Sequence, residues 1–171
     1  MVAFWLMPAR EEREFFESLI DLLSVRFDAP RFEPHVTLFG GRDVQPDRAV
    51  QVLHELPVGE PIKLSIKRLT FSSEFTKTLF VEFRASAEAV ALTSAIRSAT
   101  GSKSDYQFSP HLSLVYKNLP PREKAEVAQS LKMPFEIAMC DAVKVITGNA
   151  GTSGPADVAS WSTLAERRLT R

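Results

Sequence analysis

Residues 109–116 read Ser-Pro-His-Leu-Ser-Leu-Val-Tyr, and residues 33–40 read Glu-Pro-His-Val-Thr-Leu-Phe-Gly, so one short pattern occurs twice in the chain. Each copy contains proline, histidine, an apolar residue, a hydroxyl residue and leucine in that order. A proline followed by alternating polar and apolar residues is typical of the start of a β-strand. Because side chains two apart on a strand share a face, each copy is expected to present an imidazole and a hydroxyl side by side.

The polar residues of the two copies are His35 with Thr37 and His111 with Ser113. If the two strands face each other across a groove, these side chains form a site that holds a phosphate between two imidazoles. Attack of water at phosphorus needs one group that removes a proton from water and another that protonates the leaving oxygen, and histidine titrates where both forms are available. The hydroxyls can donate hydrogen bonds to the non-bridging oxygens. The duplication therefore predicts acid–base chemistry on a phosphate ester without a metal.

The composition is that of an ordinary globular protein, and it narrows the classes of ligand. The chain has 171 residues, of which 44% are hydrophobic and 25% charged, and this predicts one domain over residues 1–171. Its 21 basic and 21 acidic residues balance. The balance favours a small phosphate-bearing molecule, such as a cyclic nucleotide, or a short RNA end over a long duplex.

No feature of the sequence predicts export or membrane insertion. The N-terminal residues lack the leading positive cluster of a signal peptide, and no apolar run approaches ~20 residues. The single cysteine, Cys140, excludes an intrachain disulfide and a multi-cysteine metal site. The chain also has no glycine-rich phosphate loop. We therefore expect a monomeric cytoplasmic protein without membrane contact, metal or cofactor.

Hydrophobic periodicity divides the chain into strands and helices. Helical spacing and capping signals predict helices at residues 10–25, 46–56, 86–100 and 120–131. Apolar or alternating runs predict strands at residues 2–7, 62–67, 79–84, 135–147 and 158–169, in addition to the two histidine strands. A hairpin turn is expected at residues 72–78, and loops are expected at residues 102–108 and 148–155. Because each histidine strand has a helix before and after it, we predict an α+β fold of two pseudo-symmetric lobes of antiparallel sheet with flanking helices around a central cleft.

The sequence resembles the two-histidine phosphoesterase superfamily, and within it the cyclic phosphodiesterases related to the plant enzyme. The mark of this superfamily is a pair of His-x-Thr/Ser-x motifs in which x is apolar, as at His35 and His111. The likeness extends to Trp-Leu-Met-Pro at residues 5–8, to residues 30–37, and to residues 110–116 with the proline-rich helix start that follows. It spans most of the chain.

The resemblance implies a bilobal fold in which histidines from both lobes face a water-filled cleft. It also implies metal-independent hydrolysis of ADP-ribose 1″,2″-cyclic phosphate and nucleoside 2′,3′-cyclic phosphates to a phosphate monoester. By position, His35 and His111 would be the acid–base pair, and Thr37 and Ser113 would bind the phosphate.

Other roles follow from the same resemblance. Tyr116 would contact the phosphate or the ribose, and Trp5 would line the substrate end of the cleft. Our interpretation has His111 as the general base for water and His35 as the acid, an order that the sequence leaves open. Residues 71–75 occupy the segment where related enzymes place aromatic residues that contact the base. The chain has no cysteine pair to match the regulatory disulfides of the plant relative.

Three other functions stay open from the sequence. The first keeps the fold and acts on RNA ends that carry a 2′,3′-cyclic phosphate, or joins and cleaves 2′-5′ linkages. The second is a module that binds a nucleotide or an RNA end without turnover, against which the intact histidines of both motifs argue. The third is a metal hydrolase, for which neither motif has further ligands at suitable spacing. Outside the motifs, His54 is expected on a helix as a surface histidine or a satisfied structural one, Cys140 in a buried strand and Trp161 in the core.

Overall fold

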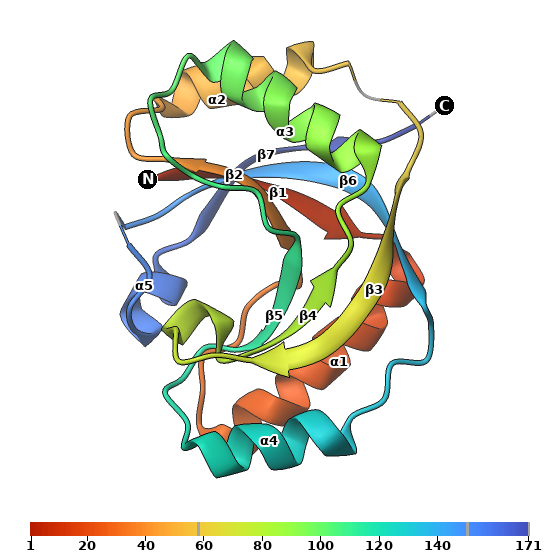
Figure 1. The fold of residues 1–171 in the computed structure, drawn as a ribbon. Helices are drawn as coiled ribbons and strands as arrows, with labels where there is room; N and C mark the ends of the chain where they lie inside the picture. The colour runs from red at the N-terminus through yellow and green to blue at the C-terminus, as the bar shows by residue number, and fades with distance from the viewer. Residues whose placement is uncertain (58, 150, 171) are drawn as a thin grey trace.

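One sheet of antiparallel strands connects both halves of the chain (Figure 1). The structure is a computed structural model, and it describes residues 1–57, 59–149 and 151–170. The strands are β1 (Val2–Pro8), β2 (Val36–Gly41), β3 (Ile62–Phe71), β4 (Leu79–Phe83), β5 (His111–Val115), β6 (Ile137–Thr147) and β7 (Ser162–Arg168). The helices are α1 (Arg10–Phe27), α2 (Pro46–Glu55), α3 (Ala87–Thr100), α4 (Pro121–Ser130) and α5 (Pro155–Ala159), and a 3₁₀ turn, η1 (Phe75–Lys77), precedes β4.

Six of the strands close into a ring, and β7 lies outside it. The order along the sheet is β1-β2-β5-β4-β3-β6-β7, and β1 also pairs with β6. The first residues of β6 pair with β3, and its later residues pair with β1. The two predicted lobes are therefore parts of one continuous antiparallel sheet, in which β6 is shared between β1, β2 and β7 on one side and β3, β4 and β5 on the other.

The lobes meet again at a single residue pair, Val36 of β2 with Leu112 of β5. Both side chains are buried in the core. Because successive residues of a strand point to opposite faces, the histidine and hydroxyl residues that flank this pair point away from the core. The two motifs therefore lie side by side in one sheet with their polar residues on the same face, and not on strands that face each other across a groove.

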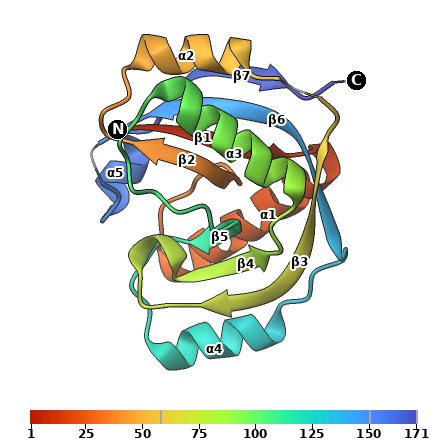
Figure 2. The ribbon, with the colours of Figure 1, turned by 45° about the horizontal axis from the view of Figure 1, so that its top comes forward.

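The helices cover the two ends of the sheet. α2 and α3 contact each other and pack on the lobe of β2, β6 and β7, whereas α1 contacts β1 and β5 and α4 contacts β3. Figure 2 shows α2 at one end of the molecule and α4 at the other. The predicted α+β class, with an antiparallel sheet and flanking helices, is confirmed. Within the described ranges, no helix is long and apolar enough to cross a membrane.

The ends of α3 show how local signals set the elements. The Ser86 side chain accepts a hydrogen bond from the N–H of Ala89, which satisfies one of the free donors at the helix start. The helix ends at Gly101, whose φ of 65° is a left-handed conformation that glycine adopts without a steric penalty. Both ends agree with the prediction.

β1 is buried on both faces, which explains its unbroken apolar sequence. Phe4 and Leu6 point into the main core. Trp5 and Met7 point the other way and form a second, smaller cluster against which Trp161 packs. Trp5 and Trp161 also line the cavity described below, so β1 links the core of the protein to its site.

The last part of the chain departs from the prediction. Alternation predicts a strand at residues 158–169, but its first residues belong to the short helix α5 and to the turn after it, and β7 begins at Ser162. The Asp157 carboxylate accepts hydrogen bonds from two backbone N–H groups that precede this helix. Such a side-chain cap stabilises a helical turn that hydrophobic alternation does not reveal. Residue 150, within the predicted loop at residues 148–155, lies outside the described residues.

Candidate active site

A cavity of about 800 Å³ lies where the two lobes meet, next to the paired histidine motifs. Its walls come from β1, from both motifs, from η1 and from the loops after β2 and α3. The wall includes Trp5, His35, Thr37, Thr76, Lys77, His111, Tyr116 and Trp161. Side chains of both motifs thus face one common space.

The two imidazoles are held by the same kind of hydrogen bond. The Nδ1–H of His35 donates to the carbonyl oxygen of Glu33 at 2.6 Å, and the Nδ1–H of His111 donates to the carbonyl oxygen of Ser109 at 2.7 Å. A carbonyl oxygen only accepts, so each Nδ1 carries the proton. Each neutral ring therefore keeps Nε2 as its basic nitrogen, available for a ligand.

Burial separates the two histidines electrostatically. His35 is only 6% exposed, and burial lowers its pKa to about 3, helped by the charges of His111 and Lys144 and opposed by the Glu33 carbonyl. Burial also lowers the pKa of His111, with a contribution from Lys77, whereas the Ser109 carbonyl and two glutamates raise it. Both rings are mainly neutral at pH 7, and an anionic phosphate between them would raise both pKa values.

Aromatic rings hold His35 in place. Its ring stacks on Trp5 with 3.6 Å between the ring centroids and 10° between the planes. Trp161 meets both rings edge-on, at 5.1 Å from Trp5 and 5.8 Å from His35. Trp5 lines the cavity and stacks on the imidazole there, and its predicted place at the substrate end stays a prediction. Trp161 was expected only in the core, and it reaches the site from between α5 and β7, far from both motifs in sequence.

Tyr116 lies in the cavity wall between other aromatic rings. Phe32 stacks on it at 4.0 Å between centroids, and Phe75 lies at 6.0 Å in a similar orientation. Burial raises the pKa of its phenol. The phenol is therefore a neutral hydrogen-bonding group at the wall of the site. Of the predicted aromatic segment at residues 71–75, Phe75 contacts this wall.

The two hydroxyl residues differ in what they offer. Thr37 lines the cavity and pairs with Trp5 across the β1–β2 ladder, so both side chains lie on the cavity face. Ser113 is buried behind the wall, and its hydroxyl donates to the carbonyl oxygen of Thr76 at 2.6 Å. The hydroxyl proton of Ser113 is therefore already donated to Thr76, and the predicted contact of Ser113 with the phosphate stays a prediction.

Positive charge at the cavity comes from residues that the sequence did not single out. Lys77, in η1, lines the wall close enough to His111 to lower its pKa. Arg42 and Lys103 line the cavity from the loops after β2 and α3. The sequence predicts only a turn at residues 72–78, and nothing local distinguishes a turn lysine from one beside an active histidine.

His54 and Cys140 lie outside the site, in the elements where they were expected. His54 is exposed on α2, and Cys140 is buried in β6. Burial raises the pKa of the Cys140 thiol, so it is neutral. Among residues 1–57, 59–149 and 151–170, no three His, Cys, Asp or Glu side chains are grouped so that they could hold a metal ion.

Comparison with known proteins places this arrangement in a family. The chain matches the family model described as the 2′-5′ RNA ligase superfamily over residues 13–152. It is 25% identical over 121 residues to a cyclic phosphodiesterase of Arabidopsis thaliana, a match that covers 70% of this chain and 67% of the relative. These relationships show an enzyme of the phosphoesterase kind.

Solved structures show the same fold at low sequence identity. The crystal structure of E. coli LigT complexed with 3′-AMP has a TM-score of 0.63 and 13% identity, and the match covers 99% of this chain and 98% of that one. The crystal structure of TT0787 of Thermus thermophilus has a TM-score of 0.60 and 14% identity, with 98% and 97% covered. The chain belongs to the 2′-5′ RNA ligase superfamily, the two-histidine phosphoesterases that the duplicated motif predicted.

Proposed function

We propose that this protein hydrolyses ribose cyclic phosphates to phosphate monoesters, with His35 and His111 as its acid–base pair and without a metal. Its substrates would be nucleoside 2′,3′-cyclic phosphates and ADP-ribose 1″,2″-cyclic phosphate. The observation that supports this most is the matched pair of Nδ1–H hydrogen bonds, which leaves two Nε2 atoms from two lobes at one cavity. The curated relative is itself a cyclic phosphodiesterase.

The reaction needs only proton transfers from the protein. One imidazole takes a proton from water as the water oxygen attacks phosphorus. The bond from phosphorus to one ribose oxygen breaks, and the other imidazole gives a proton to that oxygen. The ring opens to a monoester and a free hydroxyl, and the proton gained by the base balances the proton lost by the acid. Thr37 would donate a hydrogen bond to a non-bridging oxygen as charge builds on it, and Lys77 would attract the anionic phosphate as it binds.

The electrostatics favour one order of roles. The pair must carry one proton beyond the two on the Nδ1 atoms, and this proton favours His111. Burial lowers the pKa of His35 to about 3, whereas the burial that lowers the pKa of His111 is opposed by the Ser109 carbonyl and by Glu74 and Glu82. A neutral His35 is suited to act as the base, and a protonated His111 is suited to act as the acid. This order is the reverse of the one expected from the sequence.

A second candidate substrate is an RNA end with a 2′,3′-cyclic phosphate, or a 2′-5′ linkage. The cavity extends past the histidines to Arg42 and Lys103, and these cations could contact a second phosphate. Rates on a cyclic mononucleotide and on a short oligonucleotide, compared at several salt concentrations, separate the two substrates. Polyanion binding weakens steeply as salt rises.

The test of the proposed function is hydrolysis of nucleoside 2′,3′-cyclic monophosphates in excess EDTA. We expect turnover to persist in EDTA and to fall by about two orders of magnitude or more in His35→Ala and in His111→Ala. His54→Ala is the matched control, because His54 is exposed on α2, and it should retain parental activity. Binding without turnover in the parent would instead support the binding module, and loss of turnover in EDTA alone would show that a metal takes part.

A further inference from the structure

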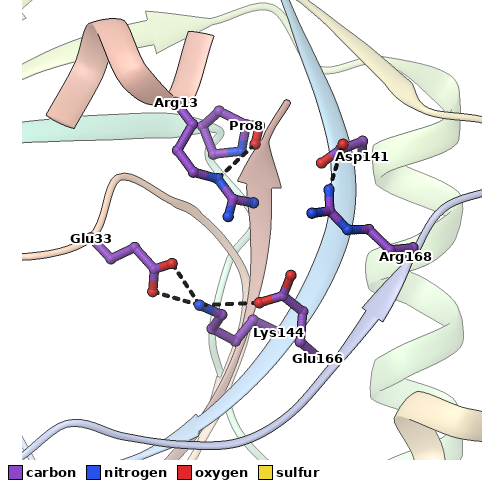
Figure 3. A network of polar contacts seen from close by, with 7 residues as sticks. All are labelled: Pro8, Arg13, Glu33, Asp141, Lys144, Glu166 and Arg168. Carbon is purple, nitrogen blue, oxygen red and sulfur yellow. Dashed lines mark hydrogen bonds and ion pairs between the residues drawn. The ribbon is translucent and has the colours of Figure 1, made fainter. Parts of the chain in front are cut away.

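A lysine lies buried behind the stacked pair of Trp5 and His35. Lys144, in the middle of β6, is only 7% exposed. Its ammonium donates to both carboxylate oxygens of Glu33 at 2.6 Å and lies 3.2 Å from a carboxylate oxygen of Glu166 (Figure 3). One buried cation is thus shared by two carboxylates from different parts of the chain.

The position of Lys144 in the sheet is one where an apolar residue would pack well. It lies opposite Trp5 on β1 and Glu166 on β7. Ala142 and Ile146, two residues before and after it, belong to the small apolar cluster on this face. Burying an ammonium there is unfavourable unless it is paired, and well-packed apolar residues often replace such ion pairs without loss of stability. Stability alone therefore gives little reason for a lysine here.

The partner of Lys144 also holds the active-site imidazole. The carbonyl oxygen of Glu33 accepts the Nδ1–H of His35, and only Pro34 separates the two residues. Residues 29–35 form neither helix nor strand. The two carboxylate hydrogen bonds from Lys144 therefore fix a segment that has no backbone ladder of its own.

The second motif needs no such support. His111 is the first residue of β5, and it pairs with Glu82 on β4. The carbonyl oxygen of the preceding Pro110 accepts the N–H of Phe83 at 3.0 Å. The residue in the position of Glu33 is Ser109, which carries no charge. The sheet itself thus orients His111, whereas His35 precedes β2 and lies outside the ladder.

We propose that Lys144 is a positioning residue for His35: by holding the Glu33 side chain, it fixes the carbonyl that orients the imidazole and keeps Nε2 toward the cavity. The catalytic part of this inference rests on the proposed function, but the orientation of the ring does not. Lys144 has a second effect, because its charge lowers the pKa of His35 and so favours the neutral ring.

The kinetic test uses Lys144→Met, which removes the charge and keeps an unbranched side chain. We expect kcat on a nucleoside 2′,3′-cyclic phosphate to fall by about 10-fold to 100-fold with KM little changed, because a misplaced base affects chemistry more than binding. Lys144→Arg keeps the charge and should restore part of the rate. Lys63→Met, an exposed lysine on β3, is the matched control and should behave as the parent.

The second readout is nitrogen-detected NMR of the histidine rings, which needs no activity. In the parent, both rings should be Nδ1–H tautomers. In Lys144→Met, His35 should lose that preference, while His111 keeps its tautomer. Should Lys144→Met not fold, Glu33→Gln decides the question, since it weakens the same contact and should shift the tautomer of His35 in the same direction.

The kinetic and NMR measurements test the proposed function and the positioning role of Lys144 separately. A folded Lys144→Met protein with an unchanged His35 tautomer overturns the positioning role, whatever its activity. A parent protein that hydrolyses no cyclic phosphate overturns the proposed function, and the NMR result still decides whether Lys144 orients His35.

Discussion

Both histidine motifs contain an Nδ1–H hydrogen bond to a backbone carbonyl, but different parts of the structure hold the two imidazoles. His35 precedes β2, is almost fully buried, stacks on Trp5 and depends on a carbonyl whose residue is held by Lys144. His111 lies in the β4–β5 ladder, is half-buried, and has the edge-on ring of Phe80 beside it at 5.6 Å. The same ring geometry thus arises in two environments, and the environments give the two imidazoles different proton affinities. Similar motifs are therefore expected to perform different steps.

The difference between the two histidines is tested most strongly with a substrate whose leaving group needs no general acid. Deoxythymidine 3′-p-nitrophenyl phosphate releases p-nitrophenolate, which leaves without protonation. We expect His111→Ala to lose about 100-fold or more on a cyclic phosphate but about 10-fold or less on this ester, whereas His35→Ala loses activity on both. Steady-state rates of the parent and both variants on the two substrates measure these losses. The opposite pattern would restore the order of roles expected from the sequence.

A second prediction concerns acid stability. The pKa of His35 is about 3 in the folded protein and near 6.5 in an unfolded chain, so the unfolded state binds more protons between these values. The free energy of unfolding should therefore be fully present above about pH 6.5 and fall, by on the order of a few kcal/mol, as pH drops toward 3.

Urea unfolding at pH 7 and pH 4 measures that loss. His35→Phe, which keeps a ring against Trp5, should reduce the difference between the two pH values. His111→Phe is the comparison, and it should reduce the difference less because His111 is more exposed. Equal effects of the two substitutions would contradict the different burial of the two rings.

The third prediction compares the two hydroxyls. Thr37→Val removes a hydroxyl that lines the cavity and should lower kcat/KM by about 10-fold. Ser113→Ala leaves the Thr76 carbonyl without its donor and should instead cost about 1 kcal/mol of stability with a smaller kinetic effect. Kinetics and thermal unfolding of both variants test this. Equal kinetic losses would mean that the Ser113 hydroxyl turns to the substrate and that the motifs act symmetrically.

The smallest expected effect is that of the lysine beside His111. Lys77→Met should raise KM for an anionic cyclic phosphate roughly fivefold and leave kcat nearly unchanged, because one partly screened charge is lost. The difference from the parent should shrink as salt is added. A Lys77→Met variant with an unchanged KM at low salt would exclude a contact between this lysine and the phosphate.

The sequence allows the fold class and most of the site to be predicted because both depend on local patterns. Strand alternation places His35 and Thr37 on one face, and the Ser86 and Gly101 signals mark the ends of α3. The use of the Ser113 hydroxyl was not predictable, because its acceptor, the Thr76 carbonyl, comes from a turn that the fold brings over β5.

Lys144 does have a signal in the sequence. It interrupts the apolar run Ala-Val-Lys-Val-Ile at residues 142–146, and a charged residue within a buried strand implies a buried partner. The identity of the partner could not be inferred, since Glu33 is far away in sequence and belongs to a segment without regular structure. Trp161 has no such signal, because its place at the site depends on α5, which alternation hides.

The central claim is that the two histidines act as one acid–base pair on a ribose cyclic phosphate. The most direct test is kcat/KM for nucleoside 2′,3′-cyclic phosphate hydrolysis in EDTA by the parent, His35→Ala, His111→Ala and the double variant. Residues that act as a unit are strongly non-additive. We predict that each single substitution costs about 100-fold or more and that the double variant is little worse than either. Losses that simply multiply in the double variant, or a single variant that keeps near-parental activity, would contradict the claim.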